Sequence, residues 1–174
     1  RPMLLALLQA AGCKAVDGGT MPDAVEPLAR RLAELAVSAD LILTSGGVSM
    51  GGRDPVRPAF VLAGGEIAGW RVAVKPGKPI MFGRIGATAF TGLPGNPMAA
   101  FVGFHLFVAA QIARLSGQAT VPFAPFKARA AFSWQRRPGR QEVFPVRCTG
   151  IDGIGLPLLE RLGNSVSATL YPLA

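Results

Sequence analysis

The chain has 174 residues and a formal net charge of +8, and half of its residues are apolar. This length suffices for one full domain plus a smaller one, and the composition can supply a sizeable core. Aromatic residues do not interleave with the basic ones as in a nucleic-acid interface, so the charge favours a small anionic ligand and argues against nucleic acid as a partner.

The ends and the cysteines carry further expectations. The chain opens at Arg1 without an initiator Met and without a signal peptide, so we expect a C-terminal fragment of a longer, cytoplasmic protein. Cys13 and Cys148 have no metal-ligand spacing and are expected to be reduced, structural thiols.

Residues up to about 117 alternate between helical and strand patterns. In chain order the pattern predicts a helix over 2–11, a strand over 13–16, a helix from Asp23 or Glu26 to about 36, a buried strand over 40–44, and a helix from Asp54 to about 63. Strands over 67–74, 79–82 and 87–91 and a helix over 97–116 follow. This alternation predicts an α/β fold with a largely parallel sheet.

The last predicted helix is the longest apolar stretch of the chain. It contains His105, Gln111 and Arg114, so we interpret it as a core helix rather than a membrane span. His105 is the single histidine and has no Ser or Cys arrangement with which to form a nucleophilic site, so we expect a core or interface residue.

The pattern changes after Gln118. Pro122 and Pro125 mark a linker, and short strand patterns follow over 128–134, 142–148, 156–161 and 168–171. We therefore predict two domains, an α/β domain over 1–120 and a small all-β domain over 121–174 that the end of the chain cuts short.

A glycine-rich loop follows the buried strand and reads Thr44-Ser-Gly-Gly-Val-Ser-Met-Gly-Gly-Arg-Asp54. Glycines allow a close approach of backbone to ligand, and the serines add hydroxyl donors. The loop lacks the fingerprints of a P-loop and of a dinucleotide-binding turn. A connection without a ligand is the alternative. The candidate binding residues are Thr44, Ser45, Gly46, Gly47 and Ser49.

Two acids open predicted helices. Asp54 can act as an N-cap, or it can hold Mg²⁺ beside a phosphate, since Mg²⁺ prefers one or two carboxylates plus waters and phosphate oxygens. Asp23 has the same two interpretations.

Two more loops are candidate anion sites. Lys75-Pro-Gly-Lys78 frames two lysines, which either serve as point-charge partners for phosphate or are surface residues. Pro94, Gly95 and Asn96 form a rigid turn, with Asn96 as N-cap and Pro97 at the first helical position. Unpaired amides at a helix start bind anions, although a purely structural turn is the alternative.

Taken together, these four motifs in this order resemble molybdopterin molybdenumtransferase, the molybdate insertase of molybdenum-cofactor biosynthesis, to which the C-terminal domain of gephyrin also belongs. The resemblance is close over residues 1 to about 117 and loose beyond. It implies a three-layer α/β/α molybdopterin-binding domain, followed by a small β-barrel-like C-terminal domain.

The resemblance also implies a reaction and a site. Molybdate is inserted into the dithiolene of adenylylated molybdopterin, with release of AMP and a need for Mg²⁺. The family's functional acids fall on Asp54 and Asp23, with the metal on Asp54. Its lysines fall on Lys75 and Lys78, and its loop prolines on Pro94 and Pro97. The full-length protein is expected to be a homodimer that acts on small molecules and binds no membrane.

Two departures and three alternatives qualify this resemblance. Gly52 and Pro55 stand where relatives often carry an acid and a Tyr, and the family's N-terminal portion is missing, so we expect the fragment alone to be inactive. The alternatives are a molybdopterin adenylyltransferase-like enzyme, which typically reads Gly-Gly-Thr-Gly in this loop, a non-catalytic scaffold of the same fold, and a generic nucleotide-binding domain. Molybdate and tungstate both fit the sequence.

Overall fold

The computed structural model describes residues 1–48, 54–119, 126–135 and 138–162. In its first part the elements are α1 (Pro2–Ala10), α2 (Val25–Ala36), β1 (Leu41–Ser45), α3 (Val56–Leu62), β2 (Gly65–Trp70), β3 (Val74–Lys75), β4 (Met81–Ile85), β5 (Thr88–Leu93), α4 (Pro97–Gly103), the π-helix η1 (Phe104–Val108) and α5 (Ala109–Leu115). The second part contains β6 (Arg129–Ala130), β7 (Gln141–Glu142), β8 (Val146–Ile151) and β9 (Pro157–Arg161).

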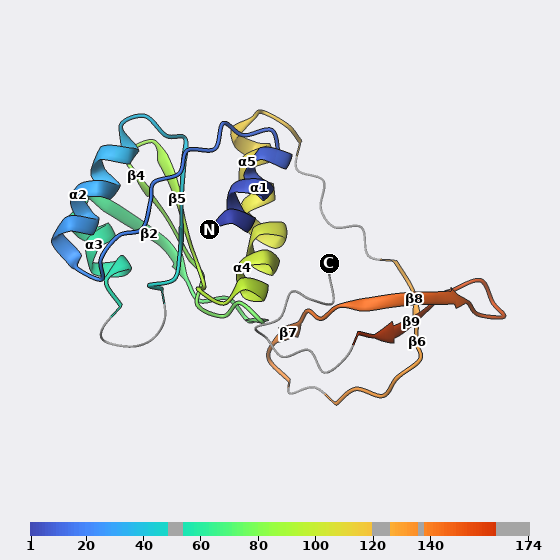
Figure 1. Ribbon diagram of the computed structural model, residues 1–174. Helices are drawn as coiled ribbons and strands as arrows, with labels where there is room; N and C mark the ends of the chain where they lie inside the picture. The colour runs from blue at the N-terminus through green and yellow to red at the C-terminus, as the bar shows by residue number, and fades with distance from the viewer. Residues whose placement is uncertain (49–53, 120–125, 136–137, 163–174) are drawn as a thin grey trace.

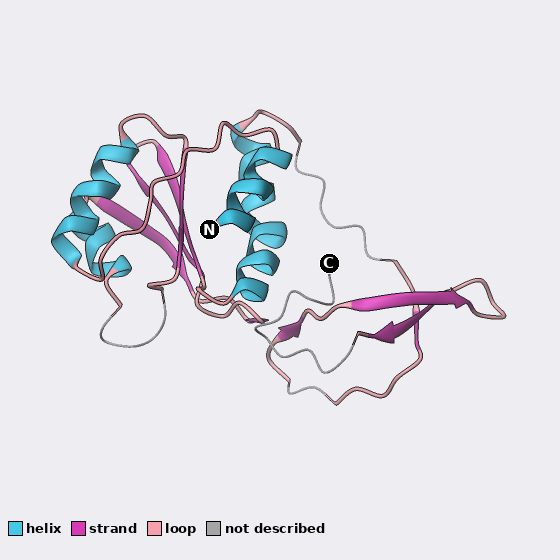
Figure 2. Ribbon diagram, in the orientation of Figure 1, coloured by secondary structure: helices cyan, strands magenta, loops and turns pink. Residues whose placement is uncertain are grey.

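The first part is a three-layer α/β/α arrangement, as the resemblance implies. A four-stranded sheet of order β1-β5-β4-β2 forms the middle layer. Helices α2 and α3 cover one face, and α1, α4 and α5 cover the other (Figures 1 and 2).

The prediction of a largely parallel sheet is wrong, because the sheet is mixed. β1 pairs with β5 in parallel, but β4 runs antiparallel to both β5 and β2. Only Gly86 and Ala87 connect β4 to β5. A parallel pair needs a crossover of about a dozen residues or more, whereas so short a connection produces an antiparallel hairpin.

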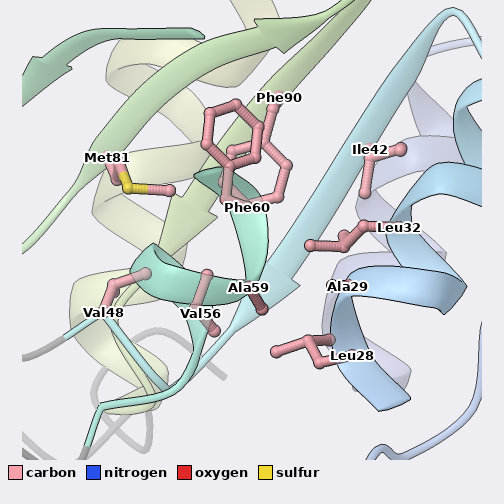
Figure 3. Packing of buried hydrophobic residues seen from close by; sticks show 10 residues of the cluster. All are labelled: Leu28, Ala29, Leu32, Ile42, Val48, Val56, Ala59, Phe60, Met81 and Phe90. Atoms are coloured by element: carbon pink, nitrogen blue, oxygen red, sulfur yellow. The ribbon is translucent and has the colours of Figure 1, made fainter. Parts of the chain in front are cut away.

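An apolar cluster between the sheet and α2–α3 forms one half of the core. Phe60 of α3 and Phe90 of β5 are fully buried, with ring centroids 4.5 Å apart, and Figure 3 shows the two rings next to each other. Gly65 and Gly83 make room for Phe60, because a Cβ atom at either position would lie 2.6 or 2.7 Å from its ring. Burial of each such aromatic side chain contributes about 1.5–3 kcal/mol.

The opposite half of the core lies under the helical run from Pro97 to Leu115. This 19-residue run is long and apolar enough, with a mean hydropathy of 1.6, to cross a membrane by length and composition. Its buried residues Phe104, Val108 and Ile112 pack with Leu93 of β5 and Leu4 of α1. The apolar stretch thus has protein partners, as a core helix requires. A single α-helix was predicted, but a π-helical segment interrupts it at Phe104–Val108.

The C-terminal part has an open sheet in the residues that the structure describes. β9 pairs with β6 in parallel and with β8 in an antiparallel ladder, and β7 pairs instead with β3 of the first part. The predicted strand over 168–171 lies outside the described residues, so a barrel is not confirmed and the domain boundary at 120 stays a prediction.

Several predicted boundaries are also wrong. Residues 13–16 form no strand. The strand predicted over 67–74 starts earlier and ends at Trp70, where Arg71 adopts a φ of 70° and turns the chain toward β3. The strand predicted over 142–148 is divided between β7 and β8, with Pro145 between them. Since Pro has no N–H to donate to a ladder, a break at this position is expected.

Candidate functional site

Two predicted anion loops touch at one end of the parallel β1–β5 pair. The register places Ser45 opposite Leu93, so both strands end at the same level. The Gly46 N–H donates to the Leu93 carbonyl over 2.9 Å. A Cβ atom on Gly95 would lie only 3.4 Å from the Gly46 Cα atom. The glycine loop and the Pro94–Pro97 turn are therefore one surface, at the strand ends where open α/β sheets bind ligands.

The glycine loop depends on backbone conformations that side chains disfavour. Gly46 and Gly47 have φ values of 86° and 68°. A Cβ atom on Gly47 would lie 2.5 Å from Val56 Cγ2 and 3.5 Å from Asp54 Oδ1. The loop is thus pressed against the start of α3, with the Asp54 carboxylate beside it.

Asp54 stabilises the start of α3. Its Oδ1 atom accepts a hydrogen bond from the Val56 N–H over 3.3 Å, but Pro55 and not Asp54 occupies the N-cap position, so the predicted helix start at Asp54 is wrong by one residue. The contact supports a structural role for Asp54 at the start of α3, and its role as a Mg²⁺ ligand stays a prediction.

The two hydroxyl residues at the end of β1 differ in accessibility. The Thr44 Oγ1 atom is buried and has no hydrogen-bond partner among the described residues. Thr44 lies opposite Gly92, and Val48 covers that position so closely that a Cβ atom on Gly92 would lie 2.5 Å from Val48 Cγ1. Ser45 is exposed. Ser45 can therefore reach a ligand directly, whereas the Thr44 hydroxyl is enclosed.

The helix start after the turn is capped as predicted. Asn96 Oδ1 accepts from the Ala99 N–H over 3.0 Å, and Pro97 occupies the first helical position. The Ala100 N–H donates to the Asn96 carbonyl over 2.9 Å, and Pro97 has no N–H. In the first turn only the Met98 N–H has no partner among the described residues. The helix start therefore offers fewer amides to an anion than the sequence suggested.

The lysine bend packs against the same helix start. A Cβ atom on Gly77 would lie 3.8 Å from the Ala99 carbonyl oxygen, and the buried Val74 packs with Met98 and Val102. The Lys75–Pro76 peptide bond is cis. Both lysines are exposed, so the bend brings two cationic side chains to the surface beside the turn.

Sequence reasoning missed Glu142, which meets Lys75, and Trp134, which holds Glu142 in place. The Lys75 ammonium lies 3.3 Å from Glu142 Oε1, and the Trp134 Nε1–H donates to Glu142 Oε2 over 2.8 Å. The hydrogen bond from Trp134 and, next among the favourable contacts, Lys75 lower the pKa of Glu142 below its usual value. No sequence signal marked these residues, because their proximity depends on the β3–β7 pairing across 67 positions.

Asp23 lies apart from these contacts. It is exposed, it makes no hydrogen bond or ion pair with a described residue, and the N-cap position of α2 belongs to Ala24. The capping interpretation of Asp23 is therefore wrong, and its catalytic role stays a prediction. Ser49 lies outside the described residues.

The described residues contain no cluster of three or more His, Cys, Asp or Glu side chains that could cage a metal. A single carboxylate, such as that of Asp54, is compatible with a Mg²⁺ ion whose other ligands are water and substrate oxygens. Two surface hollows lie elsewhere, one over α3 beside Arg57, Val61 and Leu62, the other between α2 and α3. Neither borders the loops described above.

Comparison with known proteins identifies relatives of the first part. Residues 1–114 match the family model described as "Probable molybdopterin binding domain". A molybdopterin molybdenumtransferase from Haemophilus influenzae is 38% identical over 135 residues, which cover 77% of this chain and 33% of the relative. Molybdopterin molybdenumtransferase 2 from Mycobacterium tuberculosis is 41% identical over 111 residues, covering 61% of this chain and 27% of the relative.

A solved structure shares the fold. A molybdenum cofactor biosynthesis protein from Pyrococcus furiosus superposes with a TM-score of 0.69 at 24% identity, covering 99% of this chain and 53% of that chain. The matched part of this chain covers 33% and 27% of the length of these two curated relatives. It belongs to the molybdopterin-binding domain family that includes the molybdopterin molybdenumtransferases.

Proposed function

We propose that this chain supplies the molybdopterin-binding part of a molybdopterin molybdenumtransferase of molybdenum-cofactor biosynthesis. The observation that carries the proposal is the meeting of three loops at the start of α4: Gly46 against Gly95, and Gly77 against Ala99. Molybdate and the phosphates of an adenylylated pterin are all oxyanions, so one surface of this kind can bind each of them.

In the proposed reaction, water cleaves the phosphoanhydride of adenylylated molybdopterin and AMP leaves. Molybdate then exchanges one oxo ligand, which takes up two protons and departs as water, for the two dithiolene sulfurs, with no change in the oxidation state of molybdenum. Ser45 and the Met98 N–H would donate hydrogen bonds to the oxyanions, and Lys78 would supply positive charge. Gly46 would let the substrate approach the backbone closely but would not donate a hydrogen bond to it, because its N–H already donates to the Leu93 carbonyl. A bound Mg²⁺ would neutralise pyrophosphate charge, with Asp54 as its protein carboxylate.

Further parts of the proposal rest on the sequence and on the resemblance. They are that the full-length protein is a cytoplasmic homodimer, that it binds neither nucleic acid nor membrane, and that this chain alone does not turn over substrate. The catalytic role of Asp23 belongs here too.

Isothermal titration of the 174-residue chain with AMP, in the presence of Mg²⁺, tests the proposal through binding rather than turnover. Saturable binding of AMP that weakens when Mg²⁺ is chelated supports a nucleotide-releasing enzyme. A non-catalytic scaffold would bind neither AMP nor molybdate, and that result would overturn the proposal.

A further inference from the structure

The C-terminal part reaches the lysine bend through a short parallel bridge. Val74 pairs with Gln141 and Lys75 with Glu142. The Gln141 N–H donates to the Ala73 carbonyl over 2.7 Å, and the Val143 N–H donates to the Lys75 carbonyl over 2.8 Å. Backbone hydrogen bonds therefore fix Glu142 beside Lys75 independently of the two side chains.

The Glu142 carboxylate is held at both oxygens. Lys75 contacts Oε1 and Trp134 donates to Oε2, so the side chain is only 12% exposed, against 55% for Lys75. Trp134 is itself fixed, because the Arg161 guanidinium stacks 3.9 Å from its ring centroid and Phe144 lies 5.5 Å away. A carboxylate restrained in this way stays next to Lys75 whether or not a ligand is present.

The second lysine of the bend has a different environment. Lys78 is exposed, and its side chain makes no hydrogen bond or ion pair with any residue that the structure describes. Its carbonyl accepts hydrogen bonds from the Val72 and Ile80 N–H groups, each over 3.0 Å, so its backbone is fixed while its ammonium is available. The two lysines look equivalent in the sequence. In the structure the charge of Lys75 is paired with the Glu142 carboxylate, whereas that of Lys78 has no paired carboxylate among the described residues.

We propose that Glu142 is a built-in counter-anion for Lys75, and that Lys78 is therefore the lysine of this bend that meets an incoming oxyanion. The inference deepens the proposed function and rests on it, because it assumes an oxyanion at this surface. An anion near Lys75 is attracted by the ammonium but repelled by the adjacent Glu142 carboxylate, so the two effects largely cancel. Removing that carboxylate alone should strengthen oxyanion binding by roughly 3- to 30-fold, from Coulomb's law at separations near 6 Å.

The test is calorimetric titration of the whole chain with molybdate. Four variants are compared with the wild type: Glu142→Gln, Lys75→Met combined with Glu142→Gln, Lys78→Met, and Glu160→Gln. The last is a matched control, because Glu160 is an exposed glutamate on β9. Far-UV circular dichroism verifies that each variant folds.

We expect Glu142→Gln to bind molybdate more tightly, and the double variant, which removes a neutral pair, to stay within about twofold of the wild type. Lys78→Met should bind more than about tenfold more weakly, and Glu160→Gln should not differ. Tightening of this kind cannot come from a merely structural role of Glu142.

Failure of Glu142→Gln to tighten binding, or a double variant as weak as Lys78→Met, would overturn this inference alone. Should Glu142→Gln not fold, Lys78→Met still tests the inference, and molybdate binding that this variant leaves unchanged would overturn it. A wild-type chain that binds neither molybdate nor AMP overturns the proposed function and this inference with it.

Discussion

Gly46 and Gly95 bring two loops into backbone contact, although 49 positions separate them. The Gly46 N–H bonds to Leu93, and a side chain on Gly95 would begin 3.4 Å from the Gly46 Cα atom. The surface they form depends on the conformation of the neighbouring Gly47, whose loop packs against α3. The first prediction concerns that packing.

Gly47→Ala should destabilise the protein more than Gly12→Ala, although both glycines have a positive φ. Both Gly47 and Gly12 have positive φ, 68° and 79°, but a Cβ atom meets Val56 at 2.5 Å in the first case and nothing within 4 Å in the second. Gly12→Ala should cost about 1–2 kcal/mol from backbone conformation alone, and Gly47→Ala roughly 1–3 kcal/mol more from overpacking. Urea unfolding measures both, and equal losses would contradict the packing described for this loop.

Asn96 has a capping role that can be separated from its place in the site. Asn96→Ala removes the acceptor for the Ala99 N–H and should lower the free energy of unfolding by about 1 kcal/mol. Asn96→Asp should retain that stability but weaken molybdate binding, because it adds a negative charge at the helix start. If the Asp variant bound molybdate as the wild type does, the oxyanion would not lie beside this turn.

Thr88 anchors the start of β5 to the end of α2. Its hydroxyl lies within 2.8 Å of the Ala36 carbonyl and 2.7 Å of the Ala39 carbonyl, and the residue is 3% exposed. Thr88→Val should cost about 1–3 kcal/mol, because it removes the hydroxyl that donates to these part-buried carbonyls. Thr149→Val, at an exposed position, serves as the control and should change stability little. Similar losses in both variants would argue against this anchor.

The Glu142 carboxylate predicts a specific pH dependence. Folding lowers its pKa, chiefly through the Trp134 hydrogen bond, so the ionised form stabilises the folded state. This contribution is complete above the ordinary pKa of about 4.3 and is lost as the pH falls through the lower, folded value. Trp134→Phe should move the Glu142 pKa back toward its ordinary value in a ¹³C-carboxyl NMR titration. An unchanged midpoint would mean that the indole does not set it.

Local signals predicted much of the fold. The buried strand before the glycine loop, the Asn96-Pro97 helix start and the helices on either side of the sheet all follow from hydrophobic period and capping residues. Helix–strand alternation predicts a parallel sheet, but the two-residue turn at Gly86 requires an antiparallel hairpin, so the sheet is mixed. The strand at 13–16 was wrong because a short apolar run does not distinguish a strand from a packed loop.

The sequence predicts which loops form the site, but it does not predict the contacts between residues that are distant in the chain. Glycines, prolines and lysines mark the three loops that meet at α4, because their conformational and charge properties are local. The compensation of Lys75 by Glu142 depends on a long-range bridge, and the enclosure of the Thr44 hydroxyl depends on Val48 packing over Gly92. Neither has a sequence pattern, so both required the tertiary structure.

The most direct test of the central claim is a crystal structure of this chain with molybdate, in which molybdenum is located by its anomalous scattering. The account predicts one ion at the surface between the glycine loop, the Pro94–Pro97 turn and the Lys78 side chain. Molybdenum found only elsewhere, such as over α3, or no bound molybdenum at saturating concentration, would contradict it.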